Sequence, residues 1–146
     1  MAIANPVKFV QEVRAEVAKV VIAQVNDQMP RSLGDTAMHI DKMHYVVPSD
    51  TPLFEMPMGD DADQEVVENI AAHIAELIPD GATMQLGIGA LPNAVLKFLF
   101  EKKDLGIHSE LISDGVIDLV EAGVVNGSCK SLHRGKITCG FLLGTK

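Results

Sequence analysis

The chain is poor in cysteine, in basic residues and in long apolar runs. Its two cysteines, Cys129 and Cys139, are too few for a disulfide framework and lack the spacing of a metal site. The 12 lysines and arginines are scattered and are outnumbered by 20 acidic residues, which argues against the basic face of a nucleic-acid-binding protein. No apolar run approaches the roughly 18 residues that a membrane span needs. We therefore expect no nucleic-acid partner, no membrane partner and no metal.

The N-terminus also lacks the basic stretch and following apolar stretch of a secretion signal, so the expected location is cytoplasmic. What is present is a globular composition: 146 residues, 47% of them hydrophobic, with a net charge of −8. This length is enough to bury a sizeable core.

The first half of the chain has a mixed pattern. Asn5 and Pro6 form a helix entry, and apolar residues at helical spacing predict a helix over 6–18. The β-branched run 20–25 predicts a buried strand, and 37–40 and 44–47 are shorter extended candidates. The segment 48–63 holds three prolines and an acidic cluster without periodicity, which is typical of a linker.

The second half alternates regularly between helices and strands. We expect helices over 64–78, 92–103 and 115–122, and strands over 82–89, 107–112 and 136–144. The first helix has one apolar stripe, made of Val66, Val67, Ile70, Ala71, Ile74 and Leu77. In the second helix Val95, Phe98 and Leu99 are expected to face inward, and Asp114 is expected to cap the third. Strands joined by helices through short connections predict an α/β fold with a mainly parallel sheet and flanking helices.

Two strand ends carry candidate site residues. Ligands of parallel sheets bind beyond the carboxyl ends of the strands. One such end runs into 85-QLGIGALP-92, where glycines permit close backbone approach and a helix start offers free N–H groups. The next strand carries Glu110, and a right-handed crossover puts the two ends side by side. His108 alternates with Glu110 and is expected on the same side, whereas Ser109 is expected to point away into packing.

These parts fit two kinds of site. A dinucleotide site of the Rossmann type needs three glycines and an acid about 20 residues later, but Pro92 occupies the third glycine position. Alternatively, Glu110 attacks an activated carbonyl while the backbone amides of Gly87–Gly89 stabilise the oxyanion. Spacing alone does not decide between ribose binding and nucleophilic attack.

Three motifs in order carry a family resemblance. The strings QLGIGALPNAV, DLGIHSELISDG and HRGKITCGFLLGTK closely resemble the acetyl-CoA hydrolase/transferase family of CoA-transferases, above all its 4-hydroxybutyrate and butyryl-CoA:acetate branch. The likeness begins near residue 19. It implies a fold in the NagB/RpiA-like style of CoA-transferases, incomplete at both ends. Residues 1–58 would be the end of an N-terminal domain plus linker, and 59–146 the first βα units of a C-terminal domain.

The resemblance also implies site residues and a reaction. The family's nucleophilic glutamate, in an H-S-E or H-T-E motif, falls on Glu110. Its CoA-contacting loop falls on Gln85, Leu86, Gly87, Ile88 and Gly89. The implied reaction is a ping-pong transfer of CoA from 4-hydroxybutyryl-CoA or butyryl-CoA to acetate through a glutamyl-CoA thioester.

Coenzyme A would be a substrate in that reaction, and no other cofactor is implied. The full-length form would be a homo-oligomer, and the isolated chain is expected to be inactive or nearly so. Acetyl-CoA hydrolysis and a non-catalytic truncated product remain alternatives.

Overall fold

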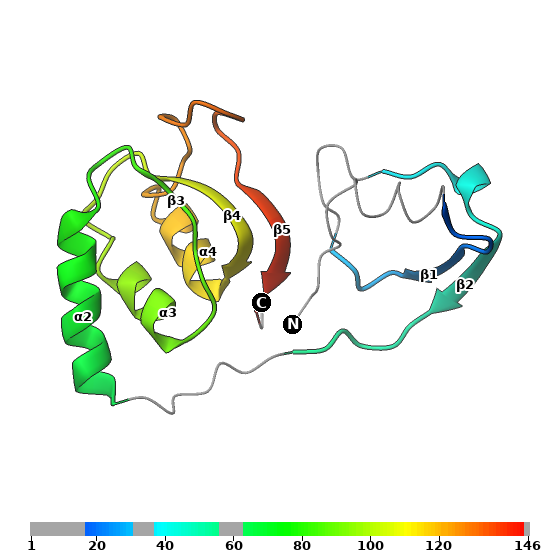
Figure 1. The fold of residues 1–146 in the computed structure, drawn as a ribbon, viewed down its shortest axis with the longest axis horizontal. Helices are drawn as coiled ribbons and strands as arrows, with labels where there is room; N and C mark the ends of the chain where they lie inside the picture. Colours follow the sequence, from blue (N-terminus) through cyan, green and yellow to red (C-terminus); the bar gives the residue numbers. More distant parts are fainter. Residues whose placement is uncertain (1–16, 31–36, 56–62, 145–146) are drawn as a thin grey trace.

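A computed structural model of the chain describes residues 17–30, 37–55 and 63–144, which form two parallel sheets (Figure 1). The N-terminal elements are β1 (Ile22–Asn26), the 3-10 turn η1 (Ile40–Lys42) and β2 (Tyr45–Ser49). The C-terminal elements are α2 (Gln64–Leu77), β3 (Thr83–Met84), α3 (Ala90–Lys97), β4 (Gly106–Ser113), α4 (Asp114–Glu121) and β5 (Thr138–Leu143). The helix expected over 6–18 lies almost wholly outside the described residues, and so does the expected boundary at 58 and 59.

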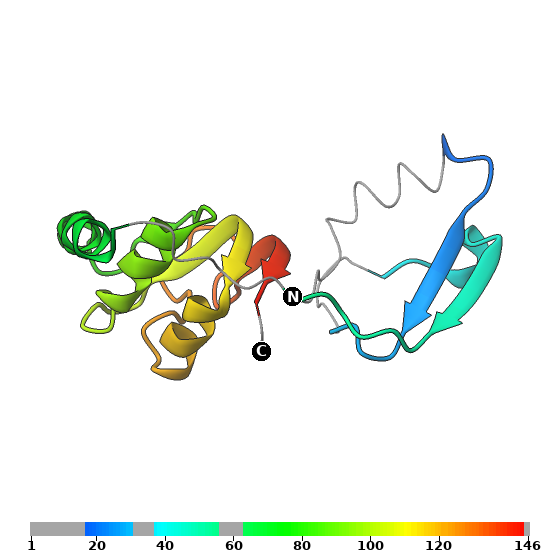
Figure 2. The ribbon, with the colours of Figure 1, turned by 90° about the horizontal axis from the view of Figure 1, so that it is seen from below.

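The larger sheet has the order β3-β4-β5, and every pair is parallel, which confirms the α/β class. Right-handed crossovers between strands in sequential order place their helices on the same face. Accordingly α3 and α4, the helices of the two crossovers, contact each other, and α2, which precedes β3, packs against α3. Figure 2 shows α2 end-on beside α3, at the opposite end of this unit from β5. The core lies between this helical layer and the sheet, and its fully buried members include Leu99, Leu105, Ile107 and Leu119.

The helix α2 was predicted correctly, but its apolar stripe faces two ways. Ala71 and Ala75 are buried against the core, and Val67 and Ile74 pack partly against it. Three members of the predicted stripe are exposed instead: Val66, Ile70 and Leu77. Small alanine side chains let α2 lie close to α3, so the larger residues on the adjoining face stay outside that contact.

The helix α3 starts and ends earlier than predicted. Gly89 is its N-cap and Pro92 lies in its first turn, where a missing N–H removes no helical hydrogen bond. The helix ends at Lys97, and Phe98 follows as a C-cap with φ −94° and ψ 4°. Phe98 is therefore 41% exposed, against the prediction that it faces inward, and Leu96 is buried.

The start of α4 also differs in detail from the prediction. Ser113 holds the N-cap position, with φ −120° and ψ 174°, and Asp114 is the first residue of the helix. The predicted strand over 82–89 is reduced to Thr83–Met84, because the chain leaves the sheet there.

The N-terminal sheet pairs β1 with β2 in parallel, from Ile22 opposite Tyr45 to Asn26 opposite Ser49. The prediction of a buried strand is wrong within the described residues, since Ile22 is 64% and Val25 49% exposed. The segment 37–40 was predicted to be extended, but its last residue begins η1. Within the described part of the chain, no helix is long and apolar enough to cross a membrane.

Candidate functional site

Glu110 lies on the face of the larger sheet opposite the helices. Along β4 both His108 and Glu110 are exposed, as expected for residues that share a face, whereas Ser109 between them is buried. The sequence predicted Glu110 at the end of its strand. The structure places it three residues before the end, because pairing with β5 extends β4 to Ser113. Its carboxylate is therefore presented by a strand interior, which is a firmer support than a loop.

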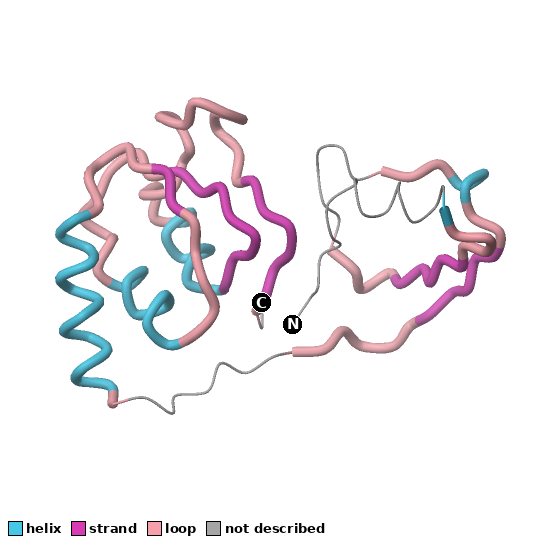
Figure 3. Tube along the Cα trace, in the orientation of Figure 1, coloured by secondary structure: helices cyan, strands magenta, loops and turns pink. Residues whose placement is uncertain are grey.

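The alternation of exposed and buried residues in β4 ends at Glu110, because the three residues that follow it in the strand are all buried. Ile107 and Ile112 both belong to the core, although residues five apart in a regular strand point to opposite faces. The register with β5 runs through Ser109 and Cys139 and resumes at Leu111 and Phe141. Figure 3 shows both strands bending along their length. The register keeps the same offset before and after Glu110, so neither strand has an inserted residue at the predicted nucleophile.

Gly140 lies between Cys139 and Phe141, the partners of the two residues that flank Glu110. Since glycine has no side chain, β5 leaves the flank of Glu110 open. Gly140 could not be singled out from the sequence, because its position opposite Glu110 depends on the register of β5.

The predicted CoA-contacting residues form the connection between β3 and α3, which we call the glycine loop (residues 85–89). Gln85, Gly87 and Ile88 are exposed, while Leu86 and Gly89 are half-buried. Gly89 has φ +126°, a conformation essentially restricted to glycine, and turns the chain into α3. The first N–H groups of α3 have no partner within the helix and carry its partial positive charge. The loop can therefore present backbone donors to an anion.

The glycine loop is joined to β4 through Ser109. The Ser109 hydroxyl accepts a hydrogen bond from the Leu86 N–H at 3.0 Å and donates one to the Leu86 carbonyl at 3.2 Å. The structure thus brings the loop beside the strand that carries Glu110, as the topology predicted. The prediction that Ser109 points into packing missed this role, because the hydroxyl's partner lies 23 residues away.

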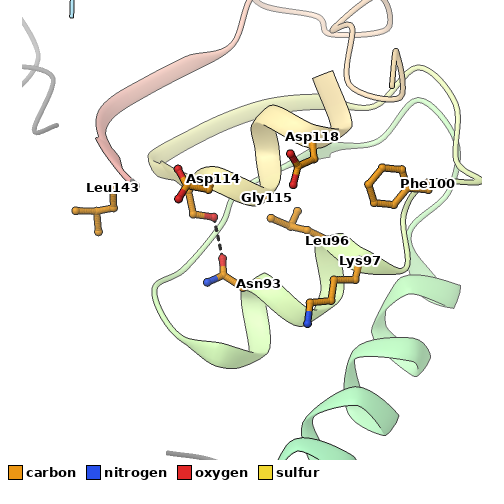
Figure 4. Close-up of a pocket in the computed structure, with 10 residues that line it drawn as sticks. Asn93, Leu96, Lys97, Phe100, Asp114, Gly115, Asp118 and Leu143 are labelled. Atoms are coloured by element: carbon orange, nitrogen blue, oxygen red, sulfur yellow. Dashed lines mark hydrogen bonds between the residues drawn. The ribbon is translucent and has the colours of Figure 1, made fainter. Parts of the chain in front are cut away.

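A separate cavity of about 320 Å³ opens between α3 and α4, beyond the ends of β4 and β5 (Figure 4). The polar side chains of its lining are those of Asn93, Lys97, Ser113, Asp114 and Asp118, and the Ser113 hydroxyl donates to the Asn93 side-chain oxygen at 2.8 Å. None of the predicted site residues lines it. The predicted site residues therefore lie outside this cavity.

Cys139 is the other potential nucleophile near β4, since it pairs with Ser109. Although the residue is exposed, partial burial of its thiol raises the pKa, so the thiol stays protonated at neutral pH. Among the described residues, no three His, Cys, Asp or Glu side chains are grouped to hold a metal ion. Glu110 is thus the better candidate for covalent chemistry near β4.

Comparisons with known proteins give a consistent result, although no family model matches the chain. It is 55% identical over 134 residues to a 4-hydroxybutyrate coenzyme A transferase of Clostridium kluyveri, covering 90% of this chain and 30% of that protein. It is 45% identical over 128 residues to a succinyl-CoA:cyclohexane-1-carboxylate CoA transferase of Geobacter metallireducens, covering 88% and 29%.

Among solved structures, a 4-hydroxybutyrate CoA-transferase of Porphyromonas gingivalis superimposes with a TM-score of 0.83 at 41% identity. That match covers 92% of this chain and 34% of the other. The chain thus spans about 30% of the length of the curated relatives it matches. Over that segment its sequence and its fold are similar to those of these CoA transferases, which confirms the resemblance carried by the three motifs.

Proposed function

We propose that this chain supplies the nucleophilic part of an acyl-CoA:carboxylate CoA-transferase. The observation that carries the proposal is the placement of Glu110 on an open sheet face, beside a glycine loop that offers backbone N–H donors. The similarity to CoA transferases supports the same reading, since it extends over about nine-tenths of the chain.

The reaction needs one carboxylate that changes partners twice. Glu110 attacks the thioester carbonyl of an acyl-CoA, which forms a mixed anhydride and releases CoA thiolate. The thiolate attacks the glutamyl carbonyl, releasing the carboxylic acid as its anion and leaving a glutamyl-CoA thioester. An acceptor carboxylate then attacks the thioester, and the same steps in reverse deliver the new acyl-CoA and restore Glu110.

Each attack places negative charge on a carbonyl oxygen. Backbone donors fixed before the reaction stabilise such charge without reorganising. The amides of the glycine loop and of the first turn of α3 are the candidates for this role, with Gln85, Leu86, Gly87, Ile88 and Gly89 forming the contact surface for CoA.

The substrate class follows from the relatives and stays a proposal for this chain. Their names include 4-hydroxybutyrate and a cyclic carboxylate. We propose 4-hydroxybutyryl-CoA or butyryl-CoA as donor and acetate as acceptor, in the cytoplasm, within a homo-oligomer and with no cofactor besides CoA as substrate. Hydrolysis is the main competing outcome, because water that reaches the thioester releases CoA.

The test uses a hybrid enzyme. In it the 134 matched residues of the Clostridium kluyveri transferase are replaced by the corresponding residues of this chain. The hybrid is incubated with 4-hydroxybutyryl-CoA without acceptor, and its intact mass and peptides are measured. We expect a CoA-sized adduct on the peptide containing Glu110, and butyryl-CoA tests the alternative donor in the same way.

Adding acetate should remove the adduct and produce acetyl-CoA. The variant Glu110→Gln should form no adduct, whereas Glu121→Gln, which changes another exposed carboxylate, should behave like the parent. Turnover with an unmodified Glu110 peptide would contradict the mechanism, and CoA release without acetyl-CoA would identify a hydrolase.

A further inference from the structure

Ser109 is the residue immediately before Glu110, and its hydroxyl contacts the residue immediately before Gly87. Ser109 is 7% exposed. Its oxygen both accepts from the N–H and donates to the carbonyl of Leu86, at 3.0 and 3.2 Å. One side chain thus occupies both main-chain polar groups of a single residue in the glycine loop.

The register of the sheet explains why a side chain is needed there. β3 pairs with β4 through Thr83 opposite Gly106 and Met84 opposite Ile107. Continuing that register by two residues puts Leu86 opposite Ser109. The chain leaves the ladder after Met84, and the Ser109 hydroxyl pairs with the Leu86 main chain in its place. Leu86 would otherwise bring an unpaired N–H into a partly buried position, which is costly.

A second buried serine of β4 makes a different contact, so the bridge to the glycine loop is particular to Ser109. Ser113 is also 7% exposed, but its hydroxyl donates to the Asn93 side chain in α3. Ser113 therefore holds a helix, whereas Ser109 holds the loop that precedes α3. The two serines form a matched pair for experiments, because each loses one buried hydroxyl on conversion to alanine.

We propose that Ser109 is a positioning residue that fixes the glycine loop relative to Glu110. This inference rests on the proposed function. Nucleophile and oxyanion donors act on the same carbonyl group, so their separation must be held within a fraction of an ångström. The Ser109 bridge joins the two segments one residue before each of the reacting groups. Its loss would leave Glu110 on the sheet but allow the loop to move away from it.

The structural half is tested on this chain by amide hydrogen exchange. In Ser109→Ala the Leu86 amide should exchange at least about tenfold faster, corresponding to the loss of roughly 1.4 kcal/mol of protection. In Ser113→Ala and in Ser109→Thr, which keeps a hydroxyl, Leu86 should exchange as in the parent. The amide of Ile107 reports whether the sheet remains folded. If Ser109→Ala unfolds the chain, Ser109→Cys replaces it, because cysteine keeps the volume with a weaker donor.

The functional half is tested in the hybrid enzyme through the rate of thioester formation. Ser109→Ala should lower the rate at saturating acyl-CoA about 10- to 100-fold. The acyl-CoA concentration that gives half of that rate should stay within about twofold, since the loop displacement mainly affects the transition state. Ser109→Thr should restore most of the rate, and Ser113→Ala should match the parent.

The outcomes separate the two proposals. If the parent hybrid forms the adduct and Ser109→Ala matches it, Ser109 positions nothing and the proposed function stands. If Ser109→Ala raises the half-saturating concentration without lowering the rate, its role is in binding and the positioning proposal is overturned. If the parent hybrid forms no adduct on Glu110, the proposed function fails and the catalytic part of this inference fails with it.

Discussion

At the scale of single residues, the glycine loop contains two glycines with different constraints. Gly89 has φ +126°, and a Cβ there would meet no atom within 4 Å, so a substitution is opposed by the backbone alone. A Cβ on Gly87 would sit 3.6 Å from the Pro92 ring, which is an ordinary contact. Neither position is crowded, so the two differ mainly in the backbone strain that a side chain would cause.

We predict that Gly89→Ala lowers the free energy of unfolding by about 1 to 3 kcal/mol, since alanine rarely adopts this conformation. Gly87→Ala should change it by no more than about 0.5 kcal/mol. Chemical denaturation followed by circular dichroism measures both. Equal costs for the two variants would show that Gly89 is not the strained position.

Lys130 provides a test of pH dependence. It is 2% exposed, and its ammonium donates to the carbonyls of Ile107 and Lys136 at 2.7 and 2.5 Å. Burial lowers the pKa of this ammonium below the ordinary 10.5. Between the lowered pKa and 10.5 the unfolded chain binds more protons than the folded chain, so the contribution of Lys130 to stability rises with pH there.

We therefore predict that the free energy of unfolding of the parent minus that of Lys130→Met increases as the pH approaches 10.5. Taking the difference cancels the contributions of the other titrating groups to the free energy of unfolding. Denaturant titrations at several alkaline pH values measure it, with the exposed Lys97→Met as control. A difference that stays flat or falls over this range would mean that the folded state does not disfavour the charged Lys130.

At the scale of elements, the first half of β4 is held in place by two contacts with neighbouring segments. Near its start, the Lys130 stem lies against Gly106, where a Cβ would be 2.5 Å from the Lys130 Cγ and 3.0 Å from the Thr83 hydroxyl. Near its middle, Ser109 holds the glycine loop. The strand is thus located by contacts on either side of Ile107, upstream of Glu110.

We predict that Gly106→Ala lowers the free energy of unfolding by about 1 to 3 kcal/mol through overpacking. In a Lys130→Ala background the same substitution should cost at least about 1 kcal/mol less, because the obstructing carbons are gone. A double-mutant cycle by chemical denaturation measures this coupling. Additive effects of the two substitutions would show that Lys130 is not what limits space at Gly106.

The sequence predicted those elements whose signals are local. α2 follows from its periodicity and from the Pro79–Gly81 turn, and Glu110 and the glycine loop were placed on adjacent strands by topology alone. The errors depend on distant partners. The division of α2 into a core face and an exposed face depends on α3. The extension of β4 to Ser113, which places Glu110 inside the strand, depends on pairing with β5, about 30 residues away.

At the scale of the whole molecule, both sheets have surfaces that no other part of the described chain covers. In the described part of the chain, helices cover only one face of the larger sheet, and the aliphatic residues of β1 and β2 are largely exposed. Parallel sheets in known proteins are covered on both faces. The exposure of Glu110 is part of this pattern and contrasts with the dehydrated site that the proposed reaction requires.

This contrast leads to a prediction about the chain by itself. A fully hydrated carboxylate is a poor nucleophile, and binding energy from the CoA nucleotide cannot be used where its contact surface is incomplete. The 146-residue chain incubated with 4-hydroxybutyryl-CoA should therefore gain CoA at Glu110 at least about 100-fold more slowly than the hybrid enzyme does. Intact-mass time courses at equal concentrations measure both rates. Equal rates would mean that the open sheet face, the glycine loop and the Ser109 bridge already suffice to activate Glu110, and that dehydration by a covering layer contributes little to the chemistry.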